Sequence, residues 1–196
     1  MLTTWSQEVL FEWRRVFKLS MRVLSSFDLQ NSIEVSLQMC DKTQPLVSRI
    51  NGAYLLGKMV KYFTPKNLPI GWSQKVTIMS QDFNYEVRQE ITKQFKTIFK
   101  HLCIEDLISS KLLDRYIEVL NDEEEDVQSI AIEGLPWVIN RIQPDQVKSK
   151  IIPCLQKILQ TCQGKVKNTI LYQMGRFSEK LHNLNSLFPK LQLLAS

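Results

Sequence analysis

The feature that most constrains the fold of this chain is an apolar pattern that recurs four times at an almost constant interval. Arg49, Arg88, Gln128 and Lys167 are separated by steps of 39, 40 and 39 residues. Starting one residue before each of them, five residues follow at spacings of 4, 4, 3 and 4, which places them on one face of an α-helix. Eighteen of these twenty residues are apolar, and the two exceptions, both in the first unit, are small. The four sets are Ser48, Gly52, Leu56, Met59 and Phe63; Val87, Ile91, Phe95, Ile98 and Leu102; Val127, Ala131, Leu135, Val138 and Ile142; and Val166, Ile170, Met174, Phe177 and Leu181. The pattern predicts one structural unit repeated four times, which indicates a binding surface more than a catalytic pocket.

A second helix is expected to precede each of these sets. Helical apolar stripes occur at about 29–40, 67–80, 105–120 and 146–160. Pro69 and Pro153 fall inside two of these predicted helices, where the missing backbone donor bends a helix. Proline-containing breaks at 64–67 and 143–146 separate one unit from the next, and polar turns at 81–86 and 121–126 separate the two helices of a unit. The sequence therefore predicts an all-α fold built from stacked helix pairs.

The segments FNYEVR (83–88) and EEDVQ (124–128) occupy the same place in two successive units. Each is interpreted as the start of the second helix of its pair. Acidic and amide side chains in a first turn offset the exposed N–H groups and the positive end of the helix. Both segments are thus explained as one repeating structural element.

This arrangement resembles HEAT repeats, and the resemblance implies an α-solenoid of about five HEAT-type antiparallel helix pairs. The segments SRINGAYLLGKMVKYF, QDFNYEVRQEITKQFKTI and LNDEEEDVQSIAIEGL are similar to the HEAT region of the family of regulatory subunit 4 of protein phosphatase 4, and more distantly to the phosphatase 2A scaffold A subunit. The similarity covers about residues 45–180, in a family whose members are much longer than this chain. Gln128 departs from the usual arginine, and Gly134-Leu135-Pro136 is an uncommon helix interior. The expected organisation is a single array over 1–196, with units at about 1–25 (partial), 28–63, 67–102, 105–142, 146–182 and 183–196 (partial).

The resemblance also implies structural roles for the repeated positions. In HEAT arrays the arginine at the position of Arg49 and Arg88 pairs with an aspartate near the same turn of a neighbouring unit. Asp82 and Asp122 are the expected partners, and the result would be a ladder of ion pairs. The valines Val87, Val127 and Val166 are expected to be equivalent core positions.

Acidic and amide residues in the turns are the candidate protein-binding residues. They are Asp82, Asn84, Glu86, Asp122, Glu123, Glu124, Glu125 and Asp126. In the phosphatase scaffolds that the chain resembles, such turns line the edge that holds other subunits. The alternative interpretation is a solvated turn that only caps a helix, because short charge runs usually face water.

Composition and motifs disfavour several classes of function. The net charge of +5 comes from scattered lysines and arginines, so binding of nucleic acid is not expected. The four cysteines form no C-x-x-C pair and only two histidines are present, so no zinc site is expected. No catalytic motif occurs, which predicts a non-enzyme without a cofactor. A secretory signal and a transmembrane stretch are both lacking, so no membrane association is expected and the predicted location is the cytoplasm.

The first functional hypothesis is a non-catalytic scaffold that holds a phosphatase 2A-type catalytic subunit or its substrate. The second is a structural HEAT-repeat subunit of a large stable assembly, such as a cytoskeletal or ciliary (axonemal) complex. The apolar segments 9–17 and 187–194 motivate the second hypothesis, because a solenoid usually needs polar ends. A third, a nucleic-acid or transport adaptor, is disfavoured by the modest charge.

Overall fold

The structure is a computed structural model that describes residues 7–63, 68–161 and 164–181. The described residues form helices joined by short turns and contain no strand. The helices are α1 (Gln7–Ser20), α2 (Ser26–Met39), α3 (Leu46–Met59) with the 3-10 turn η1 (Val60–Tyr62), α4 (Trp72–Ser80), α5 (Tyr85–His101), α6 (Ile104–Ser109), α7 (Leu112–Val119), α8 (Glu125–Ile139), α9 (Pro144–Gln146), the π-helical turn η3 (Val147–Ile151), α10 (Ile152–Thr161) and α11 (Gly164–Leu181). The predicted all-α class is confirmed.

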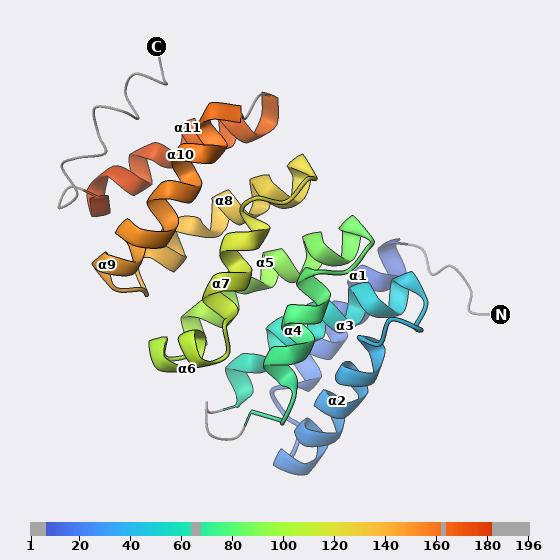
Figure 1. The fold of residues 1–196 in the computed structure, drawn as a ribbon. Coiled ribbons are helices and arrows are strands. Elements are labelled where there is room, and N and C mark those ends of the chain that lie inside the picture. The colour runs from blue at the N-terminus through green and yellow to red at the C-terminus, as the bar shows by residue number, and fades with distance from the viewer. Residues whose placement is uncertain (1–6, 64–67, 162–163, 182–196) are drawn as a thin grey trace.

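The helices form two layers. One layer consists of α3, α5, α8 and α11, in which each helix packs against the next. In Figure 1 the helices α2, α4, α7 and α10 lie in front of this layer and form the second one. Because each front helix is followed in the chain by a helix of the rear layer, the arrangement is an α-solenoid, as the repeat pattern predicted.

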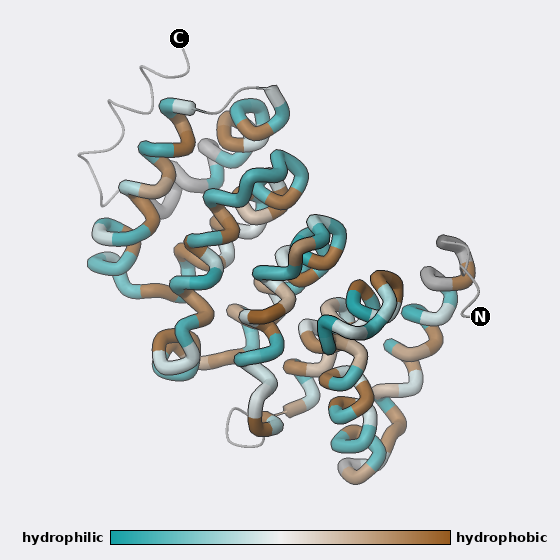
Figure 2. Tube along the Cα trace, turned by 45° about the vertical axis from the view of Figure 1, so that its right-hand side comes forward, coloured by the Kyte–Doolittle hydropathy of each residue, from teal (hydrophilic) through white to brown (hydrophobic). Residues whose placement is uncertain are grey.

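The repeated apolar positions lie between the two layers. Val87, Val127 and Val166 are at most 1% exposed, so the three equivalent valines share one kind of environment. All five positions of the second and third units are buried, whereas Ser48 and Phe63 of the first unit are half-buried. The side chains of Met174, Phe177 and Leu181 lie outside the described residues. Figure 2 shows hydrophobic and hydrophilic segments alternating along each helix, as expected for helices that bury one face.

A glycine allows α3 and α5 to pack closely. A Cβ atom on Gly57 would lie 2.1 Å from the Cβ atom of Gln94, which is closer than two carbon atoms approach without a covalent bond. The backbone of α3 therefore lies directly against a side chain of α5. This contact fixes the spacing of the first two helices in the rear layer.

The prediction of a single helix over 105–120 is wrong, because this segment forms two helices, α6 and α7. Lys111 has φ 59°, in the left-handed region, and separates α6 from α7. The Ser110 hydroxyl donates to the carbonyl of Asp106 and, at 3.4 Å, to that of Leu107. A residue in the left-handed region commonly ends a helix, and here the Lys111 N–H donates to the Ile108 carbonyl at 2.9 Å, which ends α6.

The two prolines of the front helices behave differently. Pro69 was expected inside a helix, but it lies before α4, which begins at Trp72 after Gly71 with φ 85°. A glycine in the left-handed region marks a turn, so the helix cannot extend back to the proline. Pro153 does lie inside its helix, and the preceding turn is the π-helical turn η3. Proline removes one hydrogen bond and crowds a carbonyl one turn earlier, and the wider π turn accommodates both effects.

Candidate protein-binding surfaces

The turns that contain the predicted binding residues lie along one edge of the solenoid. Figure 1 shows the turns from α2 to α3, from α4 to α5 and from α7 to α8 following one another along the same side of the molecule. The second and third of these turns carry Asp82 and Asp122. The repeat interval therefore brings residues 40 apart in the chain onto a common edge.

Both expected arginine–aspartate pairs are present and buried. Arg49 lies 3.2 Å (Nη2 to Oδ1) and 2.9 Å (Nε to Oδ2) from Asp82, and the shorter contact is an ion pair without hydrogen-bond alignment. Arg88 donates to Asp122 at 2.8 and 3.0 Å, a bidentate pair of the stronger kind. The hydrogen bond to Asp122 raises the pKa of Arg88. The pairs connect three successive units in a ladder.

Each of these aspartates also shapes its own turn. Asp82 Oδ1 accepts the N–H of Asn84 at 2.9 Å, and Asp122 Oδ1 accepts the N–H of Glu124 at 3.0 Å. The Asn84 side chain then caps α5 by accepting the N–H of Glu86 at 2.9 Å. One carboxylate thus joins a neighbouring unit to the start of the next helix.

The ladder ends after two pairs. At the arginine position of the third unit, Gln128 Nε2 donates instead to the carbonyl of Leu120 at 2.8 Å, inside its own unit. The position equivalent to Asp82 and Asp122 in the fourth unit is Thr161. No buried ion pair of this type therefore joins α8 to the last unit among the described residues.

The predicted acidic residues differ in solvent exposure and in ion pairing, and therefore in whether they are free to bind a partner. Asp82 is 3% exposed and paired, Asp122 is paired, and Glu86 is half-buried. Asp126 pairs with Lys165 across to α11. Glu123 keeps 83% of its side chain exposed despite a 3.4 Å contact with Arg88, and Glu124 and Glu125 are exposed. Their role in binding a partner stays a prediction, carried by these three glutamates.

The rear layer has a second surface that the sequence reasoning missed. It is the face of α3, α5, α8 and α11 turned away from the front helices, and it is called the rear face below. Its outward positions come two, five and nine residues after the repeated arginine position: Asn51, Tyr54 and Lys58; Glu90, Lys93 and Thr97; Ile130, Glu133 and Trp137; and Thr169, Tyr172 and Arg176. The same interval that revealed the core could have located them.

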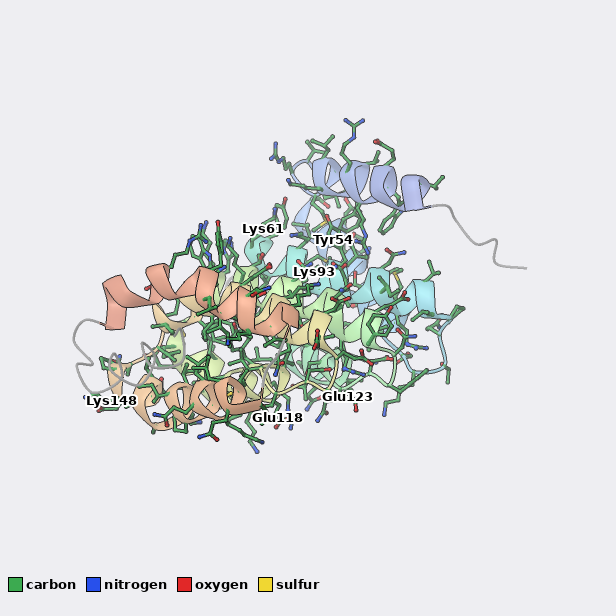
Figure 3. All side chains as sticks on the ribbon, turned by 90° about the horizontal axis from the view of Figure 1, so that it is seen from above. Tyr54, Lys61, Lys93, Glu118, Glu123 and Lys148 are labelled. Atoms are coloured by element: carbon green, nitrogen blue, oxygen red, sulfur yellow. The ribbon has the colours of Figure 1, made fainter. Side chains whose placement is uncertain are left out.

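Helix α1 covers the first part of the rear face. The guanidinium of Arg14 donates at 3.3 Å to Asn51 of α3 and to Glu90 of α5, and it lies 4.4 Å from the ring centroid of Tyr54. Figure 3 shows α1 on the side to which Tyr54 and Lys93 belong, opposite Glu118 and Glu123. Burial raises the pKa of Tyr54, although the charge of Arg14 acts in the other direction.

The remaining part of the rear face is hollowed into a groove of about 1000 Å³ between α5, α8 and α11, called the α8 groove below. Four cationic side chains line it, Lys93, Lys96, Lys165 and Arg176, together with one carboxylate, Glu133. Trp137 and Tyr172 contribute aromatic rings that are 44% and 75% exposed. The ammonium of Lys96 lies 4.3 Å from the Trp137 ring centroid, at a cation–π distance.

The described residues hold no group of three or more His, Cys, Asp or Glu side chains that could bind a metal ion. None of the helices in the described ranges is long and apolar enough to span a membrane. Cys40, Cys103 and Cys154 are free thiols, and burial raises the pKa of Cys40 to about 12.

These features define a helical-repeat solenoid, a class in which extended surfaces bind other proteins. No family model matches the chain. The chain is similar to "Serine/threonine-protein phosphatase 4 regulatory subunit 4" from Homo sapiens and from Mus musculus, at 26% identity over 147 residues in both cases. The match covers 74% of this chain and 17% of each relative, so the chain corresponds to a small part of their length.

Proposed function

We propose that the chain is a non-catalytic helical scaffold that holds a phosphatase 2A-type catalytic subunit or its substrate. The observation that carries this proposal is the coincidence of a ladder-joined helical solenoid with similarity to proteins named as phosphatase regulatory subunits. A solenoid of this kind presents separate surfaces on one chain. Here these are the turn edge with Glu123, Glu124 and Glu125, and the α8 groove.

The two surfaces suit simultaneous binding of two molecules. Glu123 lies on the opposite side of the structure from Lys93, which lines the groove (Figure 3). The edge is acidic and the groove is mainly cationic, so they would select partners of different charge. A scaffold that holds a catalytic subunit at one surface and a substrate at the other raises the effective concentration of each for the other.

A cross-linking pull-down of the tagged full chain from native cells tests the proposal. The expected result is recovery of a phosphatase 2A-type catalytic subunit, together with phosphatase activity in the precipitate. A variant with Glu123, Glu124 and Glu125 changed to lysine should lose this recovery if the edge holds the subunit. Absence of both the subunit and the activity from the wild-type precipitate would refute the phosphatase role.

A structural place in a large stable assembly, cytoskeletal or ciliary, is the second candidate. The observation that favours it is a group of exposed apolar side chains near α1 and α2: Val16, Leu19, Val23 and Phe27, which are 55–84% exposed. Exposed apolar surface favours association. The same pull-down distinguishes the candidates, because a salt-resistant assembly without phosphatase would support this one. Fractionation of the same cells tests the expected cytoplasmic or cytoskeletal location.

A further inference from the structure

The α8 groove combines features that are typical of a site for another molecule. Its walls come from three successive helices of the rear layer, and its aromatic rings, Trp137 and Tyr172, are too exposed to serve core packing. Aromatic and arginine side chains supply most of the energy at protein interfaces. Arg176 lines the same groove. Helix α1 covers the neighbouring part of the rear face through Arg14, which shows that this face accepts a polypeptide segment.

The charge of the groove selects an anionic ligand. Lys93 and Lys96 of α5 face Arg176 and Lys165 of α11 across α8. Lys165 is partly neutralised by Asp126, and Lys93 lies 3.8 Å from Glu90. Lys96 is held against the Trp137 ring and keeps its charge available to a ligand. An acidic side chain in the groove would meet cations from both walls.

A buried amide in the groove indicates that the ligand also donates hydrogen bonds. Gln173 is 3% exposed, lines the groove, and its Oε1 has no hydrogen-bond partner among the described residues. A buried acceptor without a partner costs about 1–3 kcal/mol, so such groups are usually satisfied in the functional state. Every residue of an extended peptide except proline brings a backbone N–H, which would reach this buried oxygen once the Gln173 side chain turns towards the groove.

We propose, on the basis of the scaffold role above, that the α8 groove binds an extended acidic segment of a partner protein. Adjacent helices lie about 8–10 Å apart, so three of them span roughly 20 Å. At about 3.3 Å per residue, about six extended residues cross the groove. Acidic side chains pair with Lys96 and Arg176, apolar side chains pack on Trp137 and Tyr172, and one backbone N–H donates to Gln173.

The surroundings of the groove favour a peptide over a nucleic acid. Gly164 lines the groove where α11 begins. A Cβ atom added to Gly164 would lie 3.9 Å from a carboxylate oxygen of Glu125. A continuous phosphate chain leaving the groove at this end would meet the carboxylate of Glu125. A peptide avoids this repulsion because it can place neutral or basic residues there.

Fluorescence anisotropy with the full chain tests the proposal. The probe is a labelled peptide of about ten residues, enough to cross the groove at ~3.3 Å per residue, in which glutamate and aspartate alternate with leucine. A peptide with glutamine and asparagine in their place is the charge control, and an oligouridylate of equal length is the nucleic-acid control. We expect the acidic peptide to bind at least about tenfold more tightly than either control.

Variants of the chain locate the binding. Lys96→Glu should weaken binding of the acidic peptide by about tenfold or more, whereas Lys148→Glu, an equal charge change at an exposed site on the opposite side (Figure 3), should leave it within about twofold. Gln173→Leu should weaken peptide binding by about two- to tenfold, the range for one lost hydrogen bond. It should not lower the melting temperature, because it removes an unsatisfied buried acceptor.

The outcomes separate this proposal from the scaffold role. Equal binding of the acidic and neutral peptides, tighter binding of the oligouridylate, or equal effects of Lys96→Glu and Lys148→Glu would each overturn the groove assignment. Recovery of a phosphatase in the pull-down by wild type and by Lys96→Glu alike would leave the scaffold role intact even then. If the groove binds the peptide but no phosphatase is recovered, the phosphatase role is refuted and the groove assignment stands.

Discussion

Replacing Asp82 by alanine removes the most buried carboxylate of the ladder. Its side chain is 1% exposed and that of Arg49 is 5% exposed, so the change leaves a guanidinium in the interior without its counter-ion. Removing one partner of a buried pair costs about 3–5 kcal/mol. Arg49 keeps a 2.9 Å hydrogen bond to the Gln44 carbonyl and a contact with the Phe83 ring at 4.6 Å, which favours the lower end of that range. The N–H of Asn84 also loses its acceptor.

We therefore expect Asp82→Ala to lower the free energy of unfolding by about 3 kcal/mol, which for a domain of this size corresponds to roughly 6–12 °C in melting temperature. The assay is urea and thermal unfolding followed by circular dichroism. Asp126→Ala is the matched control, because its pair with Lys165 is about half exposed on both sides and should contribute at most about 1 kcal/mol. If Asp82→Ala lies within about 1 kcal/mol of wild type, the ladder does not stabilise the array as argued.

Three further predictions test the packing of the rear layer, the attachment of α1 and the buried thiol. Gly57→Ala should destabilise the chain by about 1–3 kcal/mol, because its Cβ would clash with α5. Gly134→Ala, whose Cβ would lie 3.3 Å from a tyrosine hydroxyl, should be near neutral because the gain in helix propensity offsets the contact. Urea unfolding of both variants tests this difference. Arg14→Ala should speed chymotryptic cleavage within α1 several-fold in limited proteolysis, and Arg15→Ala, which loses only an exposed pair with a glutamate of the same helix, should not; equal rates would show that Arg14 does not hold α1 in place. Cys40, with its pKa raised to about 12 by burial, should resist iodoacetamide at about pH 8 until urea unfolds the chain, and mass spectrometry showing equal labelling before and after unfolding would contradict its burial.

The parts of the fold that could be predicted are those set by periodic burial. The spacing around Val87, Val127 and Val166 encodes helices that pack on one side, and a constant interval encodes stacking, so the rear layer followed from the sequence. The partners of Arg49 and Arg88 followed from the same interval, given the resemblance to HEAT repeats.

Other features depend on single local contacts that no periodicity encodes. The break at Lys111 comes from the left-handed backbone of that residue, and the helical stripe over 105–120 continues across it. The attachment of α1 includes an arginine, Arg14, that reaches two other helices, beside the core contacts of Trp13 and Phe17. The α8 groove was missed because its outward positions mix charged, aromatic and amide residues, which gives no hydropathy signal although the interval is the same.

Because the ladder ends at Gln128, the units before α8 and the step from α8 to α11 are expected to differ in stiffness. The turns before α8 are tied together by buried ion pairs, while the step from α8 to α11 has a glutamine that bonds within its own unit. We expect thermal bending of the array to concentrate at this step, because a solenoid deforms by small rotations between neighbouring units. The step forms one wall of the α8 groove, so bending there widens or narrows the groove. A ligand bound in the groove would restrict this bending and thereby limit how far the last unit rotates relative to the three before it.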